Sequence, residues 1–347
     1  MSCDKAIANQ AAPGNGFARC MAGSGGGAAC SMDMIAPGLG CVVAPNPGPL
    51  TGPGTNSYVL GRTRLCVIDP GPDDARHLAA LLAAIAGRQV SHVLVSHAHL
   101  DHSALAPTLA AATGAPVCAF GAAGAGRSAL MQRLAAQGLG DMGEGVDAAF
   151  APDQTLRDGQ VLQTGAGPLQ VMHTPGHLGD HLAFGWGGAL FVGDTVMGWS
   201  SSIVSPPDGD MGQYMASLAR LAAVGATVLY SGHGAPVADP AARIAALTAH
   251  RRGREAAILA ALTPGPATAA ALTAAIYHDT AQSLWGAAQR NVLAHLIDLA
   301  DRNLVTANPA PGHDARFALA WPGRHISCPT PLDAPPRHCY SPLGGPA

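Results

Sequence analysis

The stretch that decides the fold of this chain reads Ser96-His97-Ala98-His99-Leu100-Asp101-His102. It follows Val93-Leu94-Val95, an apolar, β-branched run that is typical of a buried strand. A turn that leaves the end of such a strand can point His97 and His99 at one metal ion, and Asp101 and His102 at another. Imidazole and carboxylate groups suit zinc, with manganese and iron as alternatives, because geometry and supply decide among these ions. The stretch therefore predicts metal ligands in a loop that follows a strand.

Three later pieces of the sequence carry the same kinds of side chain. In chain order they are Thr174-Pro175-Gly176-His177, Gly193-Asp194 and Gly232-His233-Gly234. Together with the first stretch they supply five imidazoles and two carboxylates, which is enough to hold two divalent ions side by side. A single His-x-His pair is weak evidence, but the four pieces in this order indicate one composite site.

These four pieces resemble the metal-binding motifs of the metallo-β-lactamase superfamily, and the resemblance covers about residues 40–262. It implies three ligands for a first ion, three for a second and one bridging carboxylate: His97, His99 and His177; Asp101, His102 and His233; and Asp194. The expected fold is α+β, a four-layer αββα sandwich in which two mixed sheets pack face to face with helices outside. A small winged-helix-like domain is expected at the C-terminal end.

Two ions about 3.5–4 Å apart can share a hydroxide and lower its pKa towards neutrality, which is the chemistry of hydrolysis. We expect Asp101 to be the catalytic residue, because its carboxylate can orient the hydroxide and accept its proton. Asp194 as a bridge favours two ions over one, and it argues against lactam cleavage, since family members that open lactams typically lack a bridging carboxylate. His181 is expected to orient a ligand imidazole, and His173 to pack beside the site or support it.

The composition favours a globular protein, with 48% hydrophobic and 12% charged residues. A net charge of −3 gives no global electrostatic case for nucleic acid. No stretch of the sequence approaches the ~18–20 apolar residues of a membrane span, so no membrane partner is expected. The eight cysteines include no Cys-x-x-Cys pair, and a chain of this size does not need a disulfide framework. We therefore expect a reducing, cytoplasmic location.

The chain divides into four segments by amino-acid composition and pattern. Residues 1–40 are expected to be a disordered extension, because Gly, Asn and Ser interrupt every apolar stretch. Residues 41–262 form the hydrolase domain, 263–321 the winged-helix-like domain, and 322–347, with seven prolines, a disordered tail. The winged-helix-like domain is predicted as three helices and a two-stranded wing: 268–277, 283–288 and 290–303, then 304–306 and 316–319.

This order of a di-metal domain, a long arginine-bearing helix and a winged-helix module is similar to the lactamase-beta-2-like branch, which includes single-strand-specific endoribonucleases. We therefore predict a dizinc hydrolase acting on single-stranded RNA or on a small-molecule ester or thioester. One alternative is a glyoxalase II-like hydroxyacylglutathione thioesterase, and another is a lactonase or phosphodiesterase on a small metabolite. Outside the enzymes, the alternative is a DNA-binding protein stabilised by metals.

The charge of the C-terminal part argues against nucleic-acid binding by the module. Over residues 249–320 six arginines oppose five acids, whereas a surface that reads phosphates is much more basic. DNA binding is therefore not expected, and the module is interpreted as a lid, a packing element or a homodimer surface. Arg251 has two interpretations: it pairs with Glu255 one helical turn on, or, with Arg252 and Arg254, it meets a phosphate or carboxylate at the cleft.

Overall fold

The computed structural model describes residues 32–140 and 145–320. Residues 1–31 of the expected extension and the whole of the expected tail lie outside the described residues. None of the helices in the described part combines the length and apolarity needed to cross a membrane.

Seven strands of the described residues form the first sheet, in the order β1 to β7. The first four pair antiparallel, and β4 to β7 pair parallel. The strands are β1 (Asp33–Ala36), β2 (Leu39–Val43), β3 (Asn56–Leu60), β4 (Arg64–Ile68), β5 (Gln89–Leu94), β6 (Val117–Ala119) and β7 (Gln154–Thr155). The helices that accompany this half are α2 (Ala75–Ile85), α3 (Leu100–Ser103) and α4 (Ala106–Thr113). Helix α5 (Ala129–Ala136) packs instead in the core of the C-terminal part, through Met131 and Leu134.

The second sheet has the order β12-β11-β10-β9-β8, with β11 and β12 parallel and the other neighbours antiparallel. Its strands are β8 (Val161–Thr164), β9 (Gly167–His173), β10 (Leu182–Trp186), β11 (Ala189–Gly193) and β12 (Val228–Ser231). Two long helices accompany it: α6 (Met211–Val224) and α7 (Pro240–Ala261). Asp239 caps α7 by accepting the Ala242 N–H, and Pro240 occupies its first turn.

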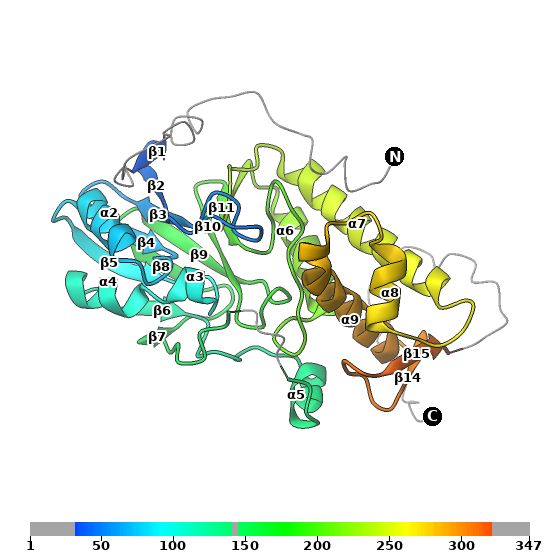
Figure 1. Cartoon of the computed structure of the whole chain (residues 1–347). Helices are drawn as coiled ribbons and strands as arrows, with labels where there is room; N and C mark the ends of the chain where they lie inside the picture. The colour runs from blue at the N-terminus through cyan, green and yellow to red at the C-terminus, as the bar shows by residue number, and fades with distance from the viewer. Residues whose placement is uncertain (1–31, 141–144, 321–347) are drawn as a thin grey trace, which may run out of the picture.

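Alternation along the strands separates the core into layers. In β3, Tyr58 and Leu60 face the second sheet while Val59 faces α2 and α4. In β11, Phe191 faces the first sheet while Val192 faces α6 and α7. Because successive side chains of a strand point to opposite faces, this pattern puts both sheets between apolar layers. The predicted order of helix, sheet, sheet and helix is confirmed, and Figure 1 shows it.

Order begins earlier in the chain than we expected. Asp33–Ala36 forms β1 and pairs with β2 through a turn at Pro37 and Gly38, so the expectation of disorder up to residue 40 is wrong from residue 33 on. Pro37 fixes φ in this turn and Gly38, at φ +79°, adopts the left-handed conformation that follows. The strand was not predicted because Asp33–Ala36 is only four residues long, which is too short to show a clear alternation.

The C-terminal part forms a third, three-stranded sheet with helices against it. Its elements are β13 (Ala267–Thr268), α8 (Ala269–Ile276), the 3-10 turn η2 (Gln282–Leu284), α9 (Trp285–Asp301), β14 (Val305–Asn308) and β15 (Arg316–Leu319). The predicted wing is confirmed by the β14–β15 pairing. The prediction of separate helices at 283–288 and 290–303 is wrong, because α9 runs through Gly286 without a break. Figure 1 shows α9 running beside α7 and α8.

Candidate metal centre

The four motifs meet because each follows the carboxyl end of a strand. The Ser96–His102 segment, whose last three residues lie in α3, follows β5, and the other three motifs follow β9, β11 and β12. These last three strands run in the same direction in the second sheet, so their ends lie at one edge. Asn56 N–H donates to Gly232 O at 2.7 Å, which joins the first sheet to the β12 loop at that edge. The edge therefore collects side chains from segments that are far apart in the sequence.

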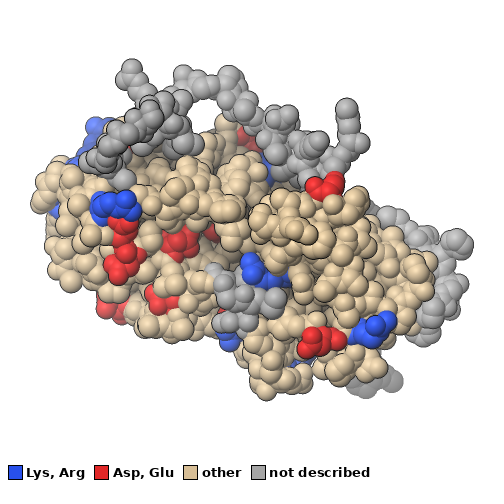
Figure 2. Space-filling model, in the orientation of Figure 1, with Lys and Arg blue, Asp and Glu red and all other residues tan. Residues whose placement is uncertain are grey.

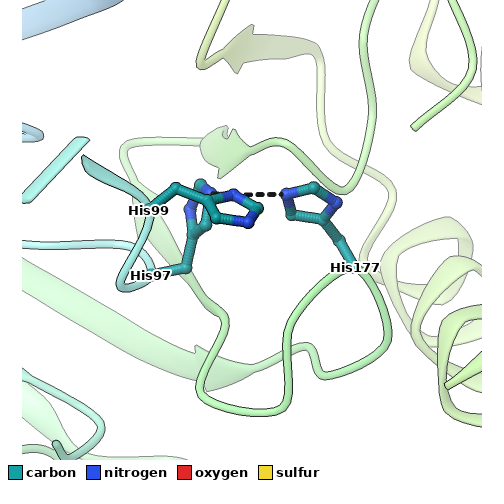
Figure 3. A group of neighbouring side chains, drawn as sticks. All are labelled: His97, His99 and His177. Atoms are coloured by element: carbon teal, nitrogen blue, oxygen red, sulfur yellow. Dashed lines mark hydrogen bonds between the residues drawn. The ribbon is translucent and has the colours of Figure 1, made fainter. Parts of the chain in front are cut away.

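Three imidazoles converge on one point, as Figure 3 shows for His97, His99 and His177. His99 Nδ1 lies 2.9 Å from His97 Nε2 and 3.1 Å from His177 Nε2. Ligands about 2.0–2.1 Å from a tetrahedral zinc ion are themselves separated by roughly 3.3 Å. The three nitrogens are thus spaced like ligands of one ion.

A second group lies beside the first and contains both carboxylates. His233 Nε2 is 3.3 Å from Asp101 Oδ2 and 3.3 Å from Asp194 Oδ2. His102 Nε2 is 3.5 Å from Asp101 Oδ2 and from Asp194 Oδ1. Asp194 Oδ2 is also 3.9 Å from His177 Nε2, in the first group. Asp194 therefore stands between the two groups, and the structure brings together all seven side chains that the sequence singled out.

The ring nitrogens that face away from the two groups are bound to oxygen atoms. Nδ1 of His177 donates to Ile203 O at 2.6 Å, and Nδ1 of His233 donates to Gly54 O at 3.2 Å. Nδ1 of His102 lies 3.0 Å from Asp69 Oδ2. Because a carbonyl or carboxylate only accepts, Nδ1 carries a proton in each case, which leaves Nε2 as the nitrogen that can bind a metal ion.

The two groups differ in electrostatics. Burial lowers the pKa of His99 to about 3, with neighbouring His177 acting in the same direction, so this imidazole is neutral as a metal ligand must be. Burial also lowers the pKa of His102, but Asp101, Asp194 and Asp69 outweigh it and raise the pKa to about 9. The nearby His102 and His233 hold the pKa of the Asp101 carboxyl below its usual value despite burial. The carboxylates therefore make the second group attractive to a cation.

Among the described residues, His102 Nε2 and Asp194 Oδ1 are two of the buried site atoms that have no hydrogen-bond partner. A buried polar atom that is left unpaired costs about 1–3 kcal/mol. The two atoms face each other at 3.5 Å, where a divalent cation would satisfy both. Gly232 leaves this space open, because a Cβ there would collide with Asp194 Oδ1 and lie 2.7 Å from His102 Cε1. The residues present thus fit metal ions.

Asp69 is a supporting residue that the sequence analysis missed. It directly follows β4, is 2% exposed, and accepts from the Ser96 N–H at 2.7 Å and the Ser96 hydroxyl at 2.8 Å as well as from His102. The signal was available, since an acid directly follows an apolar strand that pairs parallel with β5. Thr55, whose hydroxyl donates to Asp101 Oδ2 at 3.1 Å, was missed as well.

The other histidines near the site take supporting roles. His181 stacks on His97 with ring centroids 4.9 Å apart, and its Nε2 accepts the Asp194 N–H at 3.1 Å. It thus contacts the ring of one candidate ligand, His97, and accepts from the backbone of another, Asp194. His173 lies 4.0 Å from the Phe120 ring and bonds to Gly179 O, which is a packing role.

Arg251 follows neither of its two interpretations. It is 1% exposed and binds Asn291 and Ser202, while Glu255 pairs with Arg302 at 2.6 Å. Arg254 lies over the Tyr277 ring at 4.2 Å. Both interpretations treated Arg251 as accessible, either to Glu255 one turn on or to a ligand in the cleft. In the structure Arg251 lies on the face of α7 that also buries Leu247.

A cleft of about 240 Å³ opens onto the site. Its polar floor is formed by five of the seven clustered side chains, and its walls are both apolar and hydroxylic. The wall residues are Leu50, Thr51, Met197, Ser200, Ser201, Ile203 and Arg290. Apart from imidazoles, Arg290 of α9 is the one basic side chain among the described residues that line it. The face in Figure 2 carries separate acidic and basic side chains and no continuous basic band across its described residues.

Two families match the sequence. The metallo-beta-lactamase superfamily matches residues 50–233, and the beta-lactamase associated winged helix domain matches residues 268–312. The first match covers more than half of the chain.

Three curated relatives are similar to the chain. "Lactamase-like protein adaB" of Aspergillus niger is 31% identical over 64% of this chain and 62% of its own length. "Atrochrysone carboxyl ACP thioesterase" of Aspergillus fumigatus is 30% identical over 67% of each chain. "Beta-lactamase-like protein 2 homolog" of Drosophila melanogaster is 29% identical over 75% of this chain and 86% of its own. The chain thus spans less than two thirds of the Aspergillus niger relative.

A solved structure agrees with the fold. A metallo-beta-lactamase family protein from Thermus thermophilus superposes with a TM-score of 0.66 at 28% identity. The match covers 82% of this chain and 100% of that one.

Proposed function

The chain belongs to the metallo-beta-lactamase superfamily and carries its associated winged-helix domain, and from that premise we propose that it is a di-metal hydrolase of a small ester or thioester that bears an anionic group. The observation that carries the proposal is the pair of ligand groups joined by Asp194 at the floor of the cleft. The first ion would be held by His97, His99 and His177, the second by Asp101, His102 and His233. Zinc suits this set, with manganese and iron as alternatives.

Two divalent ions held by these residues would supply an activated water and would stabilise negative charge on the oxygen of the substrate. Asp101 lines the cleft, where its carboxylate can orient the attacking water and accept its proton. The Thr55 hydroxyl, which donates to Asp101 Oδ2, fixes the orientation of that carboxylate. The apolar walls at Leu50, Met197 and Ile203 exclude water from the rest of the substrate.

The proposed substrate class rests on the cleft walls. Arg290 offers a guanidinium close to the floor, and guanidinium groups bind carboxylates and phosphates strongly. Apolar walls beside it suit an acyl chain. The thioesterase relative from Aspergillus fumigatus supports a thioester as the scissile group. Single-stranded RNA fits less well, because the near-neutral C-terminal part offers few phosphate contacts.

A matched substrate pair tests this proposal. S-lactoylglutathione and the lactoyl thioester of N-acetylcysteamine share the scissile bond, but only the first carries carboxylates. We expect zinc-reconstituted protein to hydrolyse both, with a lower KM for the glutathione thioester, and Arg290→Ala to remove that difference in KM with little change in kcat. Asp101→Ala is the blank and should lower kcat by about 10²–10⁴.

Labelled single-stranded RNA is assayed beside the two thioesters. RNA cleavage that is lost in Asp101→Ala, with no thioester turnover, would contradict the thioester proposal and favour a ribonuclease. Turnover that survives Asp101→Ala would show that the activity arises outside this site.

A further inference from the structure

The segment from Met197 to Val204 lies between the candidate metal centre and the C-terminal helices. Its Ile203 carbonyl accepts the Nδ1 proton of His177 at 2.6 Å. The Ser202 hydroxyl donates to the backbone carbonyl of Asp194 at 2.5 Å. The segment therefore contacts two of the proposed ligands while it lines one wall of the cleft.

Two buried polar side chains hold this segment from the other side. Arg251 of α7 donates from Nη2 to the Ser202 carbonyl, and from Nη1 to Asn291 Oδ1 at 3.0 Å. Asn291 of α9 accepts the Val204 N–H at 3.0 Å with the same oxygen. The backbone is thus pinned on both sides of Ile203. We name this arrangement the Arg251–Asn291 brace.

The guanidinium of the brace is buried, which costs desolvation free energy. Arg251 is 1% exposed and lies over the Tyr214 ring at 5.1 Å, and the Tyr214 hydroxyl in turn donates to Thr195 O at 3.0 Å. A buried guanidinium pays a desolvation penalty that hydrogen bonds only partly offset, so such a group is weak evidence for added stability. The bonds that it makes converge instead on the two residues that flank the His177 acceptor.

Asn291 belongs to the winged-helix module, because α9 packs with α8 and the wing in one core. Figure 1 shows α9 between α6 and α8. The module thus reaches the candidate metal centre through a short chain of hydrogen bonds: Asn291 to Val204, the adjoining Ile203 carbonyl, and His177. No contact with nucleic acid is needed to give the module this role.

We propose that the winged-helix module positions a metal ligand: Asn291, together with Arg251, holds the Ser202–Val204 backbone so that the Ile203 carbonyl fixes the tautomer and direction of the His177 imidazole. Both are positioning residues, and the inference rests on the proposed metal centre only in naming His177 as a ligand. Loss of the brace should weaken binding of the ion held by His177 by about 10–100-fold, as loss of a partner behind a ligand does elsewhere.

Three variants of neighbouring residues separate positioning from general stability. Asn291→Leu keeps the size of the side chain but removes the acceptor oxygen, and Asn291→Asp restores an acceptor. Val292→Ala is the matched control, because Val292 is 1% exposed, lies next in α9 and packs in the module core away from the brace. We expect zinc affinity, measured by competition with a chromophoric chelator, to fall in Asn291→Leu, to stay within about threefold of wild type in Asn291→Asp, and to be unchanged in Val292→Ala.

A second readout needs no metal. In zinc-free protein with ¹⁵N-labelled histidine, long-range ¹H–¹⁵N spectra should show His177 as the Nδ1–H tautomer in wild type and Val292→Ala, and as a mixture in Asn291→Leu. Equal zinc affinity in wild type and folded Asn291→Leu, with an unchanged tautomer, would overturn the brace. So would an equal loss in Val292→Ala.

The two readouts also separate this inference from the proposed function. Absence of zinc binding in wild type, with the tautomer effect intact, would overturn the metal centre and support the brace. If Asn291→Leu does not fold, Asn291→Ala, which introduces no larger group, is measured in its place.

Discussion

Asp69 Oδ2 lies 3.0 Å from His102 Nδ1, with both side chains buried, and this contact sets which nitrogen of His102 faces the site. The carboxylate can only accept, so a proton resides on Nδ1, and Nε2 is the nitrogen that faces Asp101 and Asp194. A hydrogen bond to the ring nitrogen that does not bind the metal fixes the orientation of a ligand imidazole, and this commonly raises its affinity for the metal ion.

Asp69→Asn should therefore weaken metal binding while the fold is retained. The amide keeps the shape of the carboxylate and can still accept the Ser96 N–H, but its NH₂ group faces His102 Nδ1 and favours the wrong tautomer. We expect zinc affinity to fall by about 10–100-fold, measured by chelator competition. Asp153→Ala is the control, because Asp153 also accepts a backbone N–H in the first sheet, from Val117 at 2.8 Å, away from the site. An unchanged affinity in Asp69→Asn would contradict this role.

Two glycine variants test whether the site depends on space at Gly232. Gly232→Ala places a methyl group against Asp194 and His102, so zinc content after reconstitution should fall. Gly253→Ala is the contrasting change, since Gly253 is exposed within α7 and a Cβ there meets nothing within 4 Å. It should raise the free energy of unfolding by about 0.5–1 kcal/mol and leave zinc content unchanged. Full zinc content in Gly232→Ala, measured by elemental analysis, would contradict the geometry.

The pH dependence of stability should report Asp180. Burial raises the pKa of this carboxyl to about 7, although it accepts the Ala98 N–H at 3.2 Å. Since the pKa of an unfolded Asp is about 3.9, the folded protein favours the protonated form, and stability is lost as pH rises from about 4 to 7. Asp180→Asn cannot ionise but still offers an acceptor oxygen. In chelator-treated protein we expect the variant to be more stable than wild type by at least ~1 kcal/mol at pH 8 and not at pH 4.

Urea unfolding at several pH values measures this difference. A constant difference between Asp180→Asn and wild type across the range would contradict the raised pKa. Asp180 and Asp74 differ in the direction of their pKa shifts, because hydrogen bonds to Arg76 lower the pKa of the Asp74 carboxyl to about 2.

The sequence predicted the sandwich and the clustered side chains because both depend on regular patterns. Alternating strands define the two sheets, and ligands that follow strand ends meet at one edge. What escaped prediction depends on tertiary placement of backbone groups. No sequence pattern indicates that the Ile203 carbonyl faces His177, or that Arg251 is buried against the Ser202 carbonyl, because every residue has a carbonyl.

The predicted boundaries of helices and strands were wrong where the local sequence signals were weak. Separate helices were predicted at 283–288 and 290–303, whereas α9 continues through Gly286, since a glycine inside a helix costs only about 1 kcal/mol. The buried face of α9, which includes Val292, Leu296 and Leu299, offsets that cost. The opposite error occurred at β1, where disorder was predicted and a strand is present. Pairing with β2 stabilises these four residues, which are too few to show a clear pattern in the sequence.

The central claim is that two ions are held together by Asp194, and metal counting tests it most directly. Elemental analysis of zinc-reconstituted, gel-filtered protein should give two zinc ions per chain for wild type and fewer than two for Asp194→Asn, with hydrolysis falling in step. One zinc ion per chain in a fully active wild type, or two in a fully active Asp194→Asn, would contradict the two-ion centre.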